Sequence, residues 1–306
     1  MSVIASVRKN RLLNAVMEKQ LGKNRNKVER PGSGMEKKID LLTEQKLYPF
    51  LSEERQKTVI CLDCVDSTNT YLKRLAKEGA KEGTIIIANE QTAGRGRLGR
   101  SFQSKKNTGI YMSMLMHPKG ALENISEITA WVAVAVSKAI EQVTGVKPGI
   151  KWVNDLVLNG KKICGILTEM ASEGESGQVK YLIVGIGINV NNHKEDFQKE
   201  IQNIASSIRE ATGKFISRVE LSVAIIRELD LLCQRWPDEK EKYLQYYKEA
   251  CVTTGKEVRI IQRGMERIGV AENVTEEFHL QIRYLDGTKE IVSNGEVSVR
   301  GMYGYV

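Results

Sequence analysis

The sequence predicts an α+β fold, in which a mixed α/β body is followed by a small all-β module. Strand-like apolar runs alternate with helix-like segments between residues 58 and 250. Residues 255–306 consist instead of short β-like runs, for which we expect a five-stranded barrel. The dipeptide Asn159-Gly160 lies between two apolar runs, which indicates a β-hairpin because both turn positions need positive φ.

The body begins with a strand that leads into a helix. The run TVICL at 58–62 is strand-like, and Ser67 or Thr68 in the following VDSTN can serve as a helix N-cap. A face of leucine and alanine residues follows, and Gly79 ends the helix.

The next segments predict two strands and a long helix. TIIIANEQ at 84–91 has the pattern of a buried strand, and GIYMSMLMHP at 109–118 that of an alternating strand. Residues 126–144 have the pattern of a helix, with Ser126 as its N-cap and Gly145 at its end.

Beyond Gly145 we expect a hairpin, a buried strand and three helices. IKWVNDLVL at 150–158 precedes the Asn-Gly turn, KKICGILTEM at 161–170 follows it, and VKYLIVGIGINVN at 179–191 is the buried strand. The helices are expected over 197–212, 217–235 and 238–250. The second opens with the capping-box pattern from Ser217 to Glu220. In the C-terminal module, Asp286-Gly287 indicates a second hairpin turn.

The net charge of +8 is a property of an N-terminal arm. Residues 1–38 contain ten Lys or Arg against three Glu, whereas the rest of the chain contains 36 basic and 35 acidic residues. Such an arm can bind nucleic acid weakly and without sequence preference, or it can be a solvated leader.

Composition indicates a soluble globular protein, with 41% apolar and 27% charged residues. We expect a cytoplasmic location, because no apolar run approaches the ~18 residues of a membrane span and no secretory signal is evident. Five cysteines are an odd number, which argues against a disulfide framework. Cys61 and Cys64 form one CxxC without a second ligand pair, so we interpret them as ordinary strand cysteines.

The segment GRGRLGR at 94–100 alternates glycines with arginines. Glycine lets a backbone approach a ligand closely, and guanidinium groups bind phosphate or carboxylate oxygens bidentately. The segment lacks the Lys-Ser/Thr ending of a phosphate-binding Walker A loop. Because it lies between two core strands, we favour a loop that binds a small anion over an RNA-binding segment.

Two further segments carry polar residues in predicted strands. KWVND at 151–155 lies in or beside a predicted hairpin strand, and because a strand alternates its faces, we expect Lys151 and Asp155 to share one face and Asn154 to take the other. A lysine beside a carboxylate can serve a phosphate and a divalent ion, and a surface ion pair is the alternative. GIGIN at 185–189 ends a buried strand, where glycines leave room for a ligand.

Together and in this order, these segments resemble the biotin protein ligases. The segments are VDSTN, QTAGRGRLGR, KWVNDL, KKICGIL, GIGINVN and GEVSVR. The resemblance covers about residues 46–306 and is most specific in QTAGRGRLGR. It implies a mixed-sheet biotin/lipoate ligase-like catalytic domain over 46–254 and an SH3-like β-barrel domain over 255–306. The remaining arm, 1–45, is too short for the complete winged helix with which some members bind operator DNA, so we expect no specific DNA binding.

The resemblance implies an ATP-dependent ligase. Members of the family join biotin to ATP, form biotinyl-5′-AMP with release of pyrophosphate, and transfer biotin to one lysine of a carboxyl carrier protein. The expected ligands are biotin, ATP and Mg²⁺, and the expected partner is the carrier protein. The oligomeric state stays open, with a homodimer among the alternatives. Lipoate ligases share the fold class, but the complete GRGRLGR segment argues against them.

Carried over residue by residue, the resemblance implies a set of site residues. Biotin is expected to contact Ser67, Thr68, Asn69, Gln91, Arg95, Gly96, Arg97 and Lys162. ATP is expected to contact Gly94, Arg100, Lys151, Asn154 and Asn189, with Asp155 on the magnesium ion. Arg97, Lys162 and Lys151 are the expected catalytic residues. The family usually has proline where Val153 stands, and Phe197 is the candidate for stacking on adenine.

Overall fold

The structure is a computed structural model of the 306-residue chain. The chain divides into two units, Met1–Ile39 and Asp40–Val306. The described residues are 40–117, 125–173, 178–262, 264–293, 297–301 and 305. Most of the expected basic arm, and with it the expectation of no complete winged helix, lies outside the described residues.

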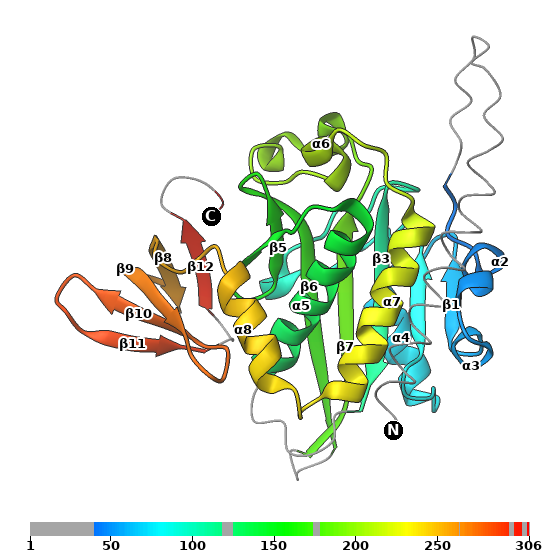
Figure 1. The fold of residues 1–306 in the computed structure, drawn as a ribbon, viewed down its shortest axis with the longest axis horizontal. Coiled ribbons are helices and arrows are strands. Elements are labelled where there is room, and N and C mark those ends of the chain that lie inside the picture. The colour runs from blue at the N-terminus through cyan, green and yellow to red at the C-terminus, as the bar shows by residue number, and fades with distance from the viewer. Residues whose placement is uncertain are drawn as a thin grey trace. The chain divides into compact units, whose positions relative to one another are not determined.

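A mixed sheet forms the centre of the body, with seven strands in the described part of the chain (Figure 1). The strands are β1 (Val59–Leu62), β2 (Ile85–Ala88), β3 (Gly109–Met116), β4 (Gly149–Lys151), β5 (Asp155–Leu158), β6 (Lys161–Glu173) and β7 (Gln178–Asn189). Their order is β1-β2-β3-β7-β6-β5-β4. β1 and β2 pair in parallel, and the other neighbours pair antiparallel, so the expectation of a mixed sheet is confirmed.

Helices cover both faces of this sheet. The helices are α2 (Glu44–Leu47), α3 (Glu53–Gln56), α4 (Thr68–Lys77), α5 (Ile125–Thr144), α6 (Ile208–Thr212), α7 (Arg218–Arg235) and α8 (Lys240–Ala250). Figure 1 shows α5 and α7 side by side across one face, and α4 lies on the other. Alternate residues of β2 divide accordingly: Ile85 and Ile87 join the core under α5 and α7, whereas Ile86 packs with Leu72 of α4.

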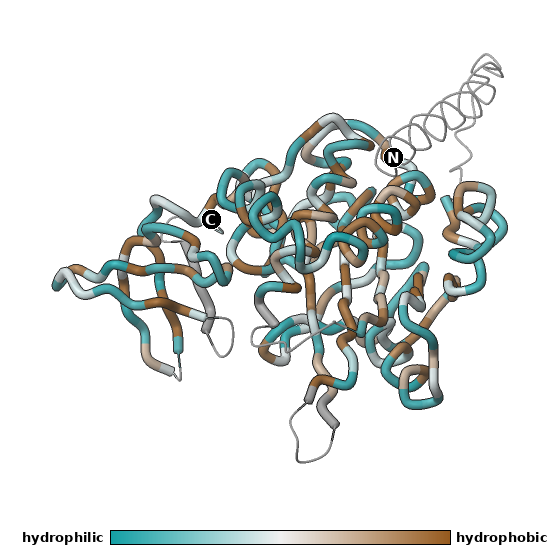
Figure 2. The backbone as a smooth tube through the Cα atoms, turned by 60° about the horizontal axis from the view of Figure 1, so that its bottom comes forward, coloured by the Kyte–Doolittle hydropathy of each residue, from teal (hydrophilic) through white to brown (hydrophobic). Residues whose placement is uncertain are grey.

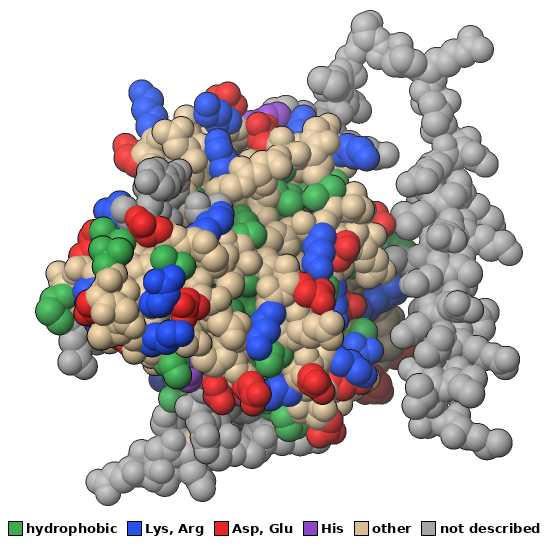
Figure 3. Space-filling view, turned by 60° about the vertical axis from the view of Figure 1, so that its left-hand side comes forward, with side chains coloured by type: hydrophobic (Ala, Val, Ile, Leu, Met, Phe, Trp, Pro, Cys, Tyr) green, Lys and Arg blue, Asp and Glu red, His purple; other side chains and the backbone are tan. Residues whose placement is uncertain are grey.

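This double cover explains the alternation predicted for the strand at 109–118. Every residue of β3 is buried, so its alternation separates two cores and not a core from solvent. The apolar colouring of the central strands in Figure 2 follows the same pattern. On the face shown in Figure 3, by contrast, basic and acidic side chains are interspersed, in keeping with the balanced charge of the body.

The predicted turn and cap residues are mostly where the sequence places them. Asn159 and Gly160 have φ of 50° and 73°, as a tight hairpin between β5 and β6 requires. Ser217 caps α7, because its hydroxyl accepts a hydrogen bond from the backbone of Glu220 at 3.2 Å. Ser67 precedes α4 but makes no capping hydrogen bond with its side chain.

Two helix predictions are wrong in detail. α5 begins at Ile125, one residue before the expected cap Ser126. In place of the helix expected over 197–212, the chain forms the short 3₁₀ turn η5 (Lys199–Ile201) and then α6, and another 3₁₀ turn, η4 (Lys194–Asp196), precedes them. α6 starts afresh because the hydroxyl of Ser207 accepts a hydrogen bond from the backbone of Glu210.

The C-terminal residues form a second, antiparallel sheet. Its described strands are β8 (Glu257–Gln262), β9 (Met265–Val274), β10 (Leu280–Tyr284), β11 (Lys289–Val292) and β12 (Val297–Gly301), in the order β11-β10-β9-β8-β12. The predicted hairpin at Asp286-Gly287 joins β10 to β11, with Gly287 at a φ of 83°. The strand order is that of an open sheet, so closure into an SH3-like barrel stays a prediction.

The two sheets share contacts at the turn that joins β4 to β5. The indole nitrogen of Trp152 donates a 2.8 Å hydrogen bond to the carbonyl of Phe278. The hydroxyl of Thr253 accepts from the backbone of Trp152 at 3.0 Å, and Tyr247 packs edge-on against Phe278. The turn between β4 and β5 is therefore fixed by residues of the C-terminal part of the chain.

A buried arginine fixes the start of the described chain. Arg218, at the beginning of α7, has no exposed surface. Its guanidinium donates to the carbonyl of Gly109 at 2.9 Å, to the side chain of Asn89 at 3.2 Å, and to the carbonyl of Asp40. Its backbone donates to the carboxylate of Asp40 at 2.6 Å. Burial lowers the pKa of Arg218, but an arginine stays charged in a protein, so these acceptors are required.

Candidate active site

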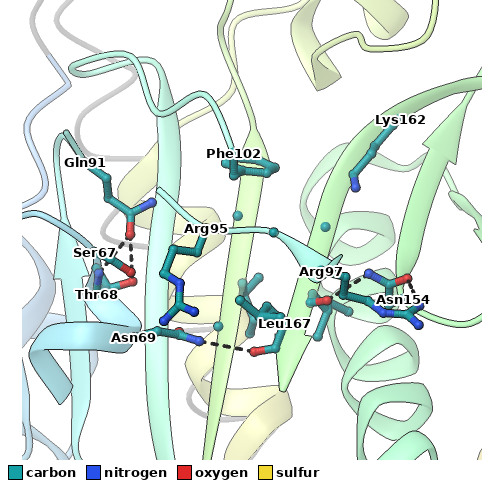
Figure 4. Close-up of a pocket in the computed structure, with 16 residues that line it drawn as sticks. Ser67, Thr68, Asn69, Gln91, Arg95, Arg97, Phe102, Asn154, Lys162 and Leu167 are labelled. Carbon is teal, nitrogen blue, oxygen red and sulfur yellow. Dashed lines mark hydrogen bonds between the residues drawn. The ribbon is translucent and has the colours of Figure 1, made fainter. Parts of the chain in front are cut away.

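A pocket lies between the loop that carries GRGRLGR, the start of α4 and the middle of β6 and β7 (Figure 4). The empty volume that it encloses, open solvent at its mouth included, is about 450 Å³. The expected site residues that line it are Ser67, Thr68, Asn69, Gln91, Arg95, Gly96, Arg97, Asn154 and Lys162. Segments far apart in the sequence therefore meet in one cavity.

The two ends of the pocket differ in charge. Figure 4 shows the neutral side chains of the 67–69 turn and Gln91 at one end, and Lys162 with Arg97 at the other. Arg95 and the ring of Phe102 lie between them. An elongated ligand with a neutral polar head and an anionic tail matches this distribution.

Hydrogen bonds organise the neutral end. The backbone and hydroxyl of Thr68 both donate to Gln91 Oε1, at 2.8 and 3.1 Å. Gln91 in turn donates to the hydroxyl of Ser104 at 2.8 Å. The hydroxyl of Ser113 lies 2.6 Å from Asn69 Oδ1 and donates to it. The polar groups of this end are thus fixed in place by their neighbours, as recognition of a neutral polar ligand requires.

Glycines in β6 and β7 leave room for the side chains of the site. A Cβ added at Gly185 would collide with the side chain of Asn69, and one at Gly187 would come within 2.7 Å of the ring of Phe102. A Cβ at Gly165 would come within 2.9 Å of Lys162 Nζ. The two glycines of GIGIN therefore have a specific reason that sequence reasoning missed, because Gly185 and Gly187 accommodate side chains from other elements.

An acidic residue that the sequence analysis missed holds the loop. Glu169 on β6 forms an ion pair with Arg95 at 3.2 Å through one carboxylate oxygen. Its other oxygen accepts a hydrogen bond from Asn69 Nδ2 at 2.9 Å. Glu169 therefore connects the arginine-rich loop with the neutral end of the pocket.

The turn between β4 and β5 organises the cationic end. Arg97 donates to Asn154 Oδ1 at 3.0 Å, and Lys162 forms a 2.6 Å ion pair with Asp155 Oδ1. Burial lowers the pKa of Arg97 and the nearby Asp155 opposes this shift, so the guanidinium stays charged in a place shielded from water. The adjacent residues Asn154 and Asp155 thus hold the side chains of Arg97 and Lys162, respectively.

The geometry of this turn corrects the prediction for KWVND. The chain reverses at residues 152–154, so Lys151 and Asp155 do not belong to one continuous strand. They are cross-strand partners in the antiparallel β4–β5 pair, so their side chains do lie on one face of the sheet, as expected, but from two strands. Lys151 is buried and its ammonium lies 3.5 Å from the ring centroid of Tyr305.

Some expected ATP contacts lie outside the pocket lining. Gly94 packs against the carbonyl of Phe102, Arg100 is exposed, and Asn189 donates to the carbonyl of Ser206 at 3.1 Å. Phe197, the candidate for stacking, is buried elsewhere, whereas Phe102 is an aromatic residue of the pocket. Sequence reasoning missed Phe102, although it lies only two residues beyond the end of the GRGRLGR segment.

The residues at Asp155 do not fit a protein-built magnesium site. Among the described residues, no cluster of three His, Cys, Asp or Glu side chains could hold a metal ion. One oxygen of Asp155 pairs with Lys162, and the other accepts a hydrogen bond from the hydroxyl of Tyr305. The carboxylate is therefore already engaged on both sides.

Comparisons with known proteins agree with this architecture. The sequence profile of the biotin/lipoate A/B protein ligase family matches residues 61–189. The bifunctional ligase/repressor BirA of Bacillus spizizenii is 40% identical over 192 residues, which are 62% of this chain and 58% of that protein. The match thus spans less than two thirds of that relative. The biotin–[acetyl-CoA-carboxylase] ligase of Mycobacterium tuberculosis is 28% identical over 76% of this chain and 85% of its own length.

One solved structure matches this chain over almost its own entire length. The biotin protein ligase from Aquifex aeolicus, in complex with biotin and ATP, superposes with a TM-score of 0.70 and 31% identity. The match includes 80% of this chain and 99% of that one. The profile match, this near-complete coverage and the pocket built from the expected motifs lead to one conclusion: the chain belongs to the biotin protein ligase family.

Proposed function

We propose that the chain activates biotin with ATP as biotinyl-5′-AMP and transfers the biotinyl group to a lysine of a biotin carboxyl carrier protein. The observation that carries the proposal is the pocket, whose neutral polar end and cationic end lie under one arginine-rich loop. The Aquifex relative, crystallised with biotin and ATP, supports the choice of ligands, and the name of the Mycobacterium relative supports the reaction.

The neutral end suits the ureido ring of biotin. That ring carries N–H donors and a carbonyl acceptor but no charge, and the pocket offers hydroxyl and amide groups in a buried setting. Ser67, Thr68 and Asn69 are each only 3% exposed. A buried site with oriented hydrogen-bonding groups rejects ligands that lack the matching groups.

The cationic end suits the reacting groups. In the first step a carboxylate oxygen of biotin attacks the α-phosphorus of ATP, a new P–O bond forms, and pyrophosphate leaves. Two anions must approach, so Arg97 and Lys162 stabilise the charge and hold the groups in line. In the second step the neutral amine of the carrier lysine attacks the acyl carbonyl and AMP leaves.

The loop protects the intermediate. A mixed anhydride hydrolyses in water, so a segment that closes over it increases the yield of transfer. Gly96 gives the loop freedom, and the ion pair of Arg95 with Glu169 holds it against β6.

The proposal extends to the location of the reaction, its metal ion, DNA binding and the oligomeric state. We assign the reaction to the cytoplasm, which the five free cysteines support. In addition, none of the described helices has the length and apolar character of a membrane span. We expect Mg²⁺ to accompany ATP as part of the substrate. Absence of specific DNA binding stays a prediction, and the choice between monomer and homodimer stays open.

Biotin-dependent exchange between ATP and labelled pyrophosphate tests the proposal. The purified chain should catalyse exchange with biotin but not with lipoate or octanoate in its place. Exchange with lipoate alone would assign the chain to the lipoate branch, and no exchange with any acid would refute adenylate chemistry.

The same assay tests the role of Arg97. Arg97→Ala should lower exchange and accelerate loss of the bound adenylate, because the pocket loses a half-buried cation. Arg283→Ala, which removes an ion pair with Glu272 in the C-terminal sheet, serves as the control and should retain the wild-type rate. Wild-type retention of the adenylate by Arg97→Ala would contradict the assignment.

A further inference from the structure

A tyrosine beyond the last strand contacts the cationic end of the site. Tyr305 follows β12 in the chain and donates a hydrogen bond from its hydroxyl to Asp155 Oδ2. The ammonium of Lys151 lies over its ring, 3.5 Å from the centroid. Burial and the neighbouring carboxylate raise the pKa of Tyr305, so the phenol keeps the proton that it donates.

The contact continues into the pocket. Asp155 Oδ2 accepts from Tyr305, while Asp155 Oδ1 forms the 2.6 Å ion pair with Lys162. Lys162 lines the pocket and, under the proposed function, stabilises the reacting anions. Because both oxygens of the Asp155 carboxylate have partners, the plane of this carboxylate is fixed. The plane in turn determines where the ammonium of Lys162 lies.

The turn that carries Asp155 is fixed by other residues of the C-terminal half. The hydroxyl of Tyr247 donates to the carbonyl of Val153 at 3.2 Å, and Trp152 donates to the carbonyl of Phe278 at 2.8 Å. These contacts hold the backbone. The hydrogen bond of Tyr305, by contrast, is made to the side chain of Asp155 itself.

We propose that Tyr305 is a positioning residue that, through Asp155, fixes the ammonium of Lys162 in the pocket. The kinetic consequence rests on the proposed function, whereas the geometric link from Tyr305 to Lys162 does not. In-line transfer between two anions depends on exact placement of the neutralising cations, and a displacement of about 1 Å can lower turnover about a hundredfold.

The test compares two tyrosines with matched surroundings. Tyr305→Phe removes the hydroxyl and keeps the ring under Lys151. Tyr284→Phe is the control, because Tyr284 also donates to a carboxylate, Glu290 at 2.7 Å, and also lies under a cation, Arg267. Tyr284 belongs to the C-terminal sheet and is outside the pocket lining.

We expect Tyr305→Phe to lower the kcat of biotin-dependent pyrophosphate exchange about tenfold or more, with the KM for biotin and the melting temperature close to wild type. Tyr284→Phe should retain the wild-type kcat. In combination with Asp155→Asn, Tyr305→Phe should add little further loss, because both variants break the same link. Additive losses in that double variant would overturn the proposal.

A second measurement does not depend on catalysis. Acylation of Lys162 by an amine-reactive ester, followed by peptide mass spectrometry on the full chain, should be faster in Tyr305→Phe than in wild type and unchanged in Tyr284→Phe. Faster labelling in a chain that shows no pyrophosphate exchange would refute the proposed function and support the link. Equal labelling of Lys162 in wild type and Tyr305→Phe overturns the link, whatever the exchange rate.

Discussion

At the scale of single residues, the packing around Gly185 shows why the pocket requires glycine at that position. The side chain of Asn69 occupies the space that a Cβ would take. Gly185→Ala must therefore displace Asn69 or shift β7. We expect the affinity for biotin to fall and the free energy of unfolding to fall by about 1–3 kcal/mol. Isothermal titration calorimetry and urea denaturation measure the two effects.

Gly96→Ala is the control for the stability effect of Gly185→Ala. The nearest atom to an added Cβ at Gly96 is the carbonyl oxygen of Arg100 at 3.4 Å, an ordinary contact distance, so its free energy of unfolding should hardly change. Wild-type biotin affinity and stability in Gly185→Ala would show that Asn69 is not fixed as described.

Glu169 provides a second prediction at this scale. In Glu169→Gln the side chain can still accept from Asn69 but loses its charge toward Arg95, so the loop should open more often. The ion pair is half exposed on the arginine side and contributes less than about 1 kcal/mol, so we expect the bound adenylate to dissociate about fivefold faster or less. Stopped-flow release of the adenylate measures this rate.

A matched ion pair on the C-terminal sheet provides the control. Glu266→Gln weakens the pairing of Glu266 with Arg259, which is distant from the loop in sequence and joins β9 to β8. Its adenylate release should equal that of wild type. If Glu169→Gln also released the adenylate at the wild-type rate, the ion pair with Arg95 would have no part in loop closure.

The motif residues of the site could be predicted from the sequence, but their partners could not. Asn69, Arg97 and Lys162 lie in segments whose composition points to ligand chemistry. Glu169 lies in an ordinary strand, and its partner Asn69 is 100 residues away. That pairing depends on the register between strands and on the position of α4, which local patterns do not contain.

At the scale of elements, the segment 197–212 shows how a tertiary contact overrides a local pattern. Phe197, Ile201, Ile204 and Ile208 recur at helical spacing, which is why the sequence favours a helix there. In the structure, Lys162 donates from its backbone to the carbonyl of Ile204 and accepts from Ser206. This bridge to β6 interrupts the helix. The Asn159-Gly160 hairpin and α7, by contrast, were predictable because their signals are local.

The cap of α7 supports a prediction about stability. Ser217→Ala leaves the backbone N–H of Glu220 without its side-chain acceptor, so the free energy of unfolding should fall by about 1 kcal/mol. Urea denaturation followed by circular dichroism measures this loss. Thr43 precedes α2 but makes no capping hydrogen bond, so Thr43→Ala should cost much less. Equal losses in the two variants would contradict the capping role of Ser217.

At the scale of the whole molecule, the buried phenol and thiol groups make the fold sensitive to alkaline pH. Burial raises the pKa of Tyr111 and of Tyr243 to about 12 from an ordinary value of 10.0. Burial likewise raises the pKa of Cys61 to about 12 from 9.0. At a pH between the ordinary and the raised pKa of such a group, the group has lost its proton in the unfolded chain but keeps it in the folded chain. The unfolded chain therefore binds fewer protons in this pH range.

We therefore expect the melting temperature to fall as the pH rises from about 9 toward 12, with stability fully present below that window. Scanning calorimetry at constant ionic strength measures this dependence. Tyr243→Phe removes one of the titrating groups and should make the decline less steep. A melting temperature that stays constant over this range would refute the linkage.

The division into a mixed-sheet body and a β module was predictable, because hairpin dipeptides and strand-length runs mark each part. Closure into a barrel is not predictable in the same way, since it depends on how β11 and β12 approach one another and not on either strand alone. The contact of Tyr305 with Asp155 joins residues 150 positions apart, and no pattern in the sequence indicates it.

The buried guanidinium of Arg218 has a practical consequence for anyone who wishes to shorten or immobilise this protein. Cutting the chain after Asp40 would remove a carbonyl to which the guanidinium donates and the carboxylate that forms a 3.8 Å ion pair with its Nε, and a buried charge without its counter-ion costs about 3–5 kcal/mol. A trimmed expression clone should therefore begin at or before Asp40, and an affinity tag is best fused upstream of that residue.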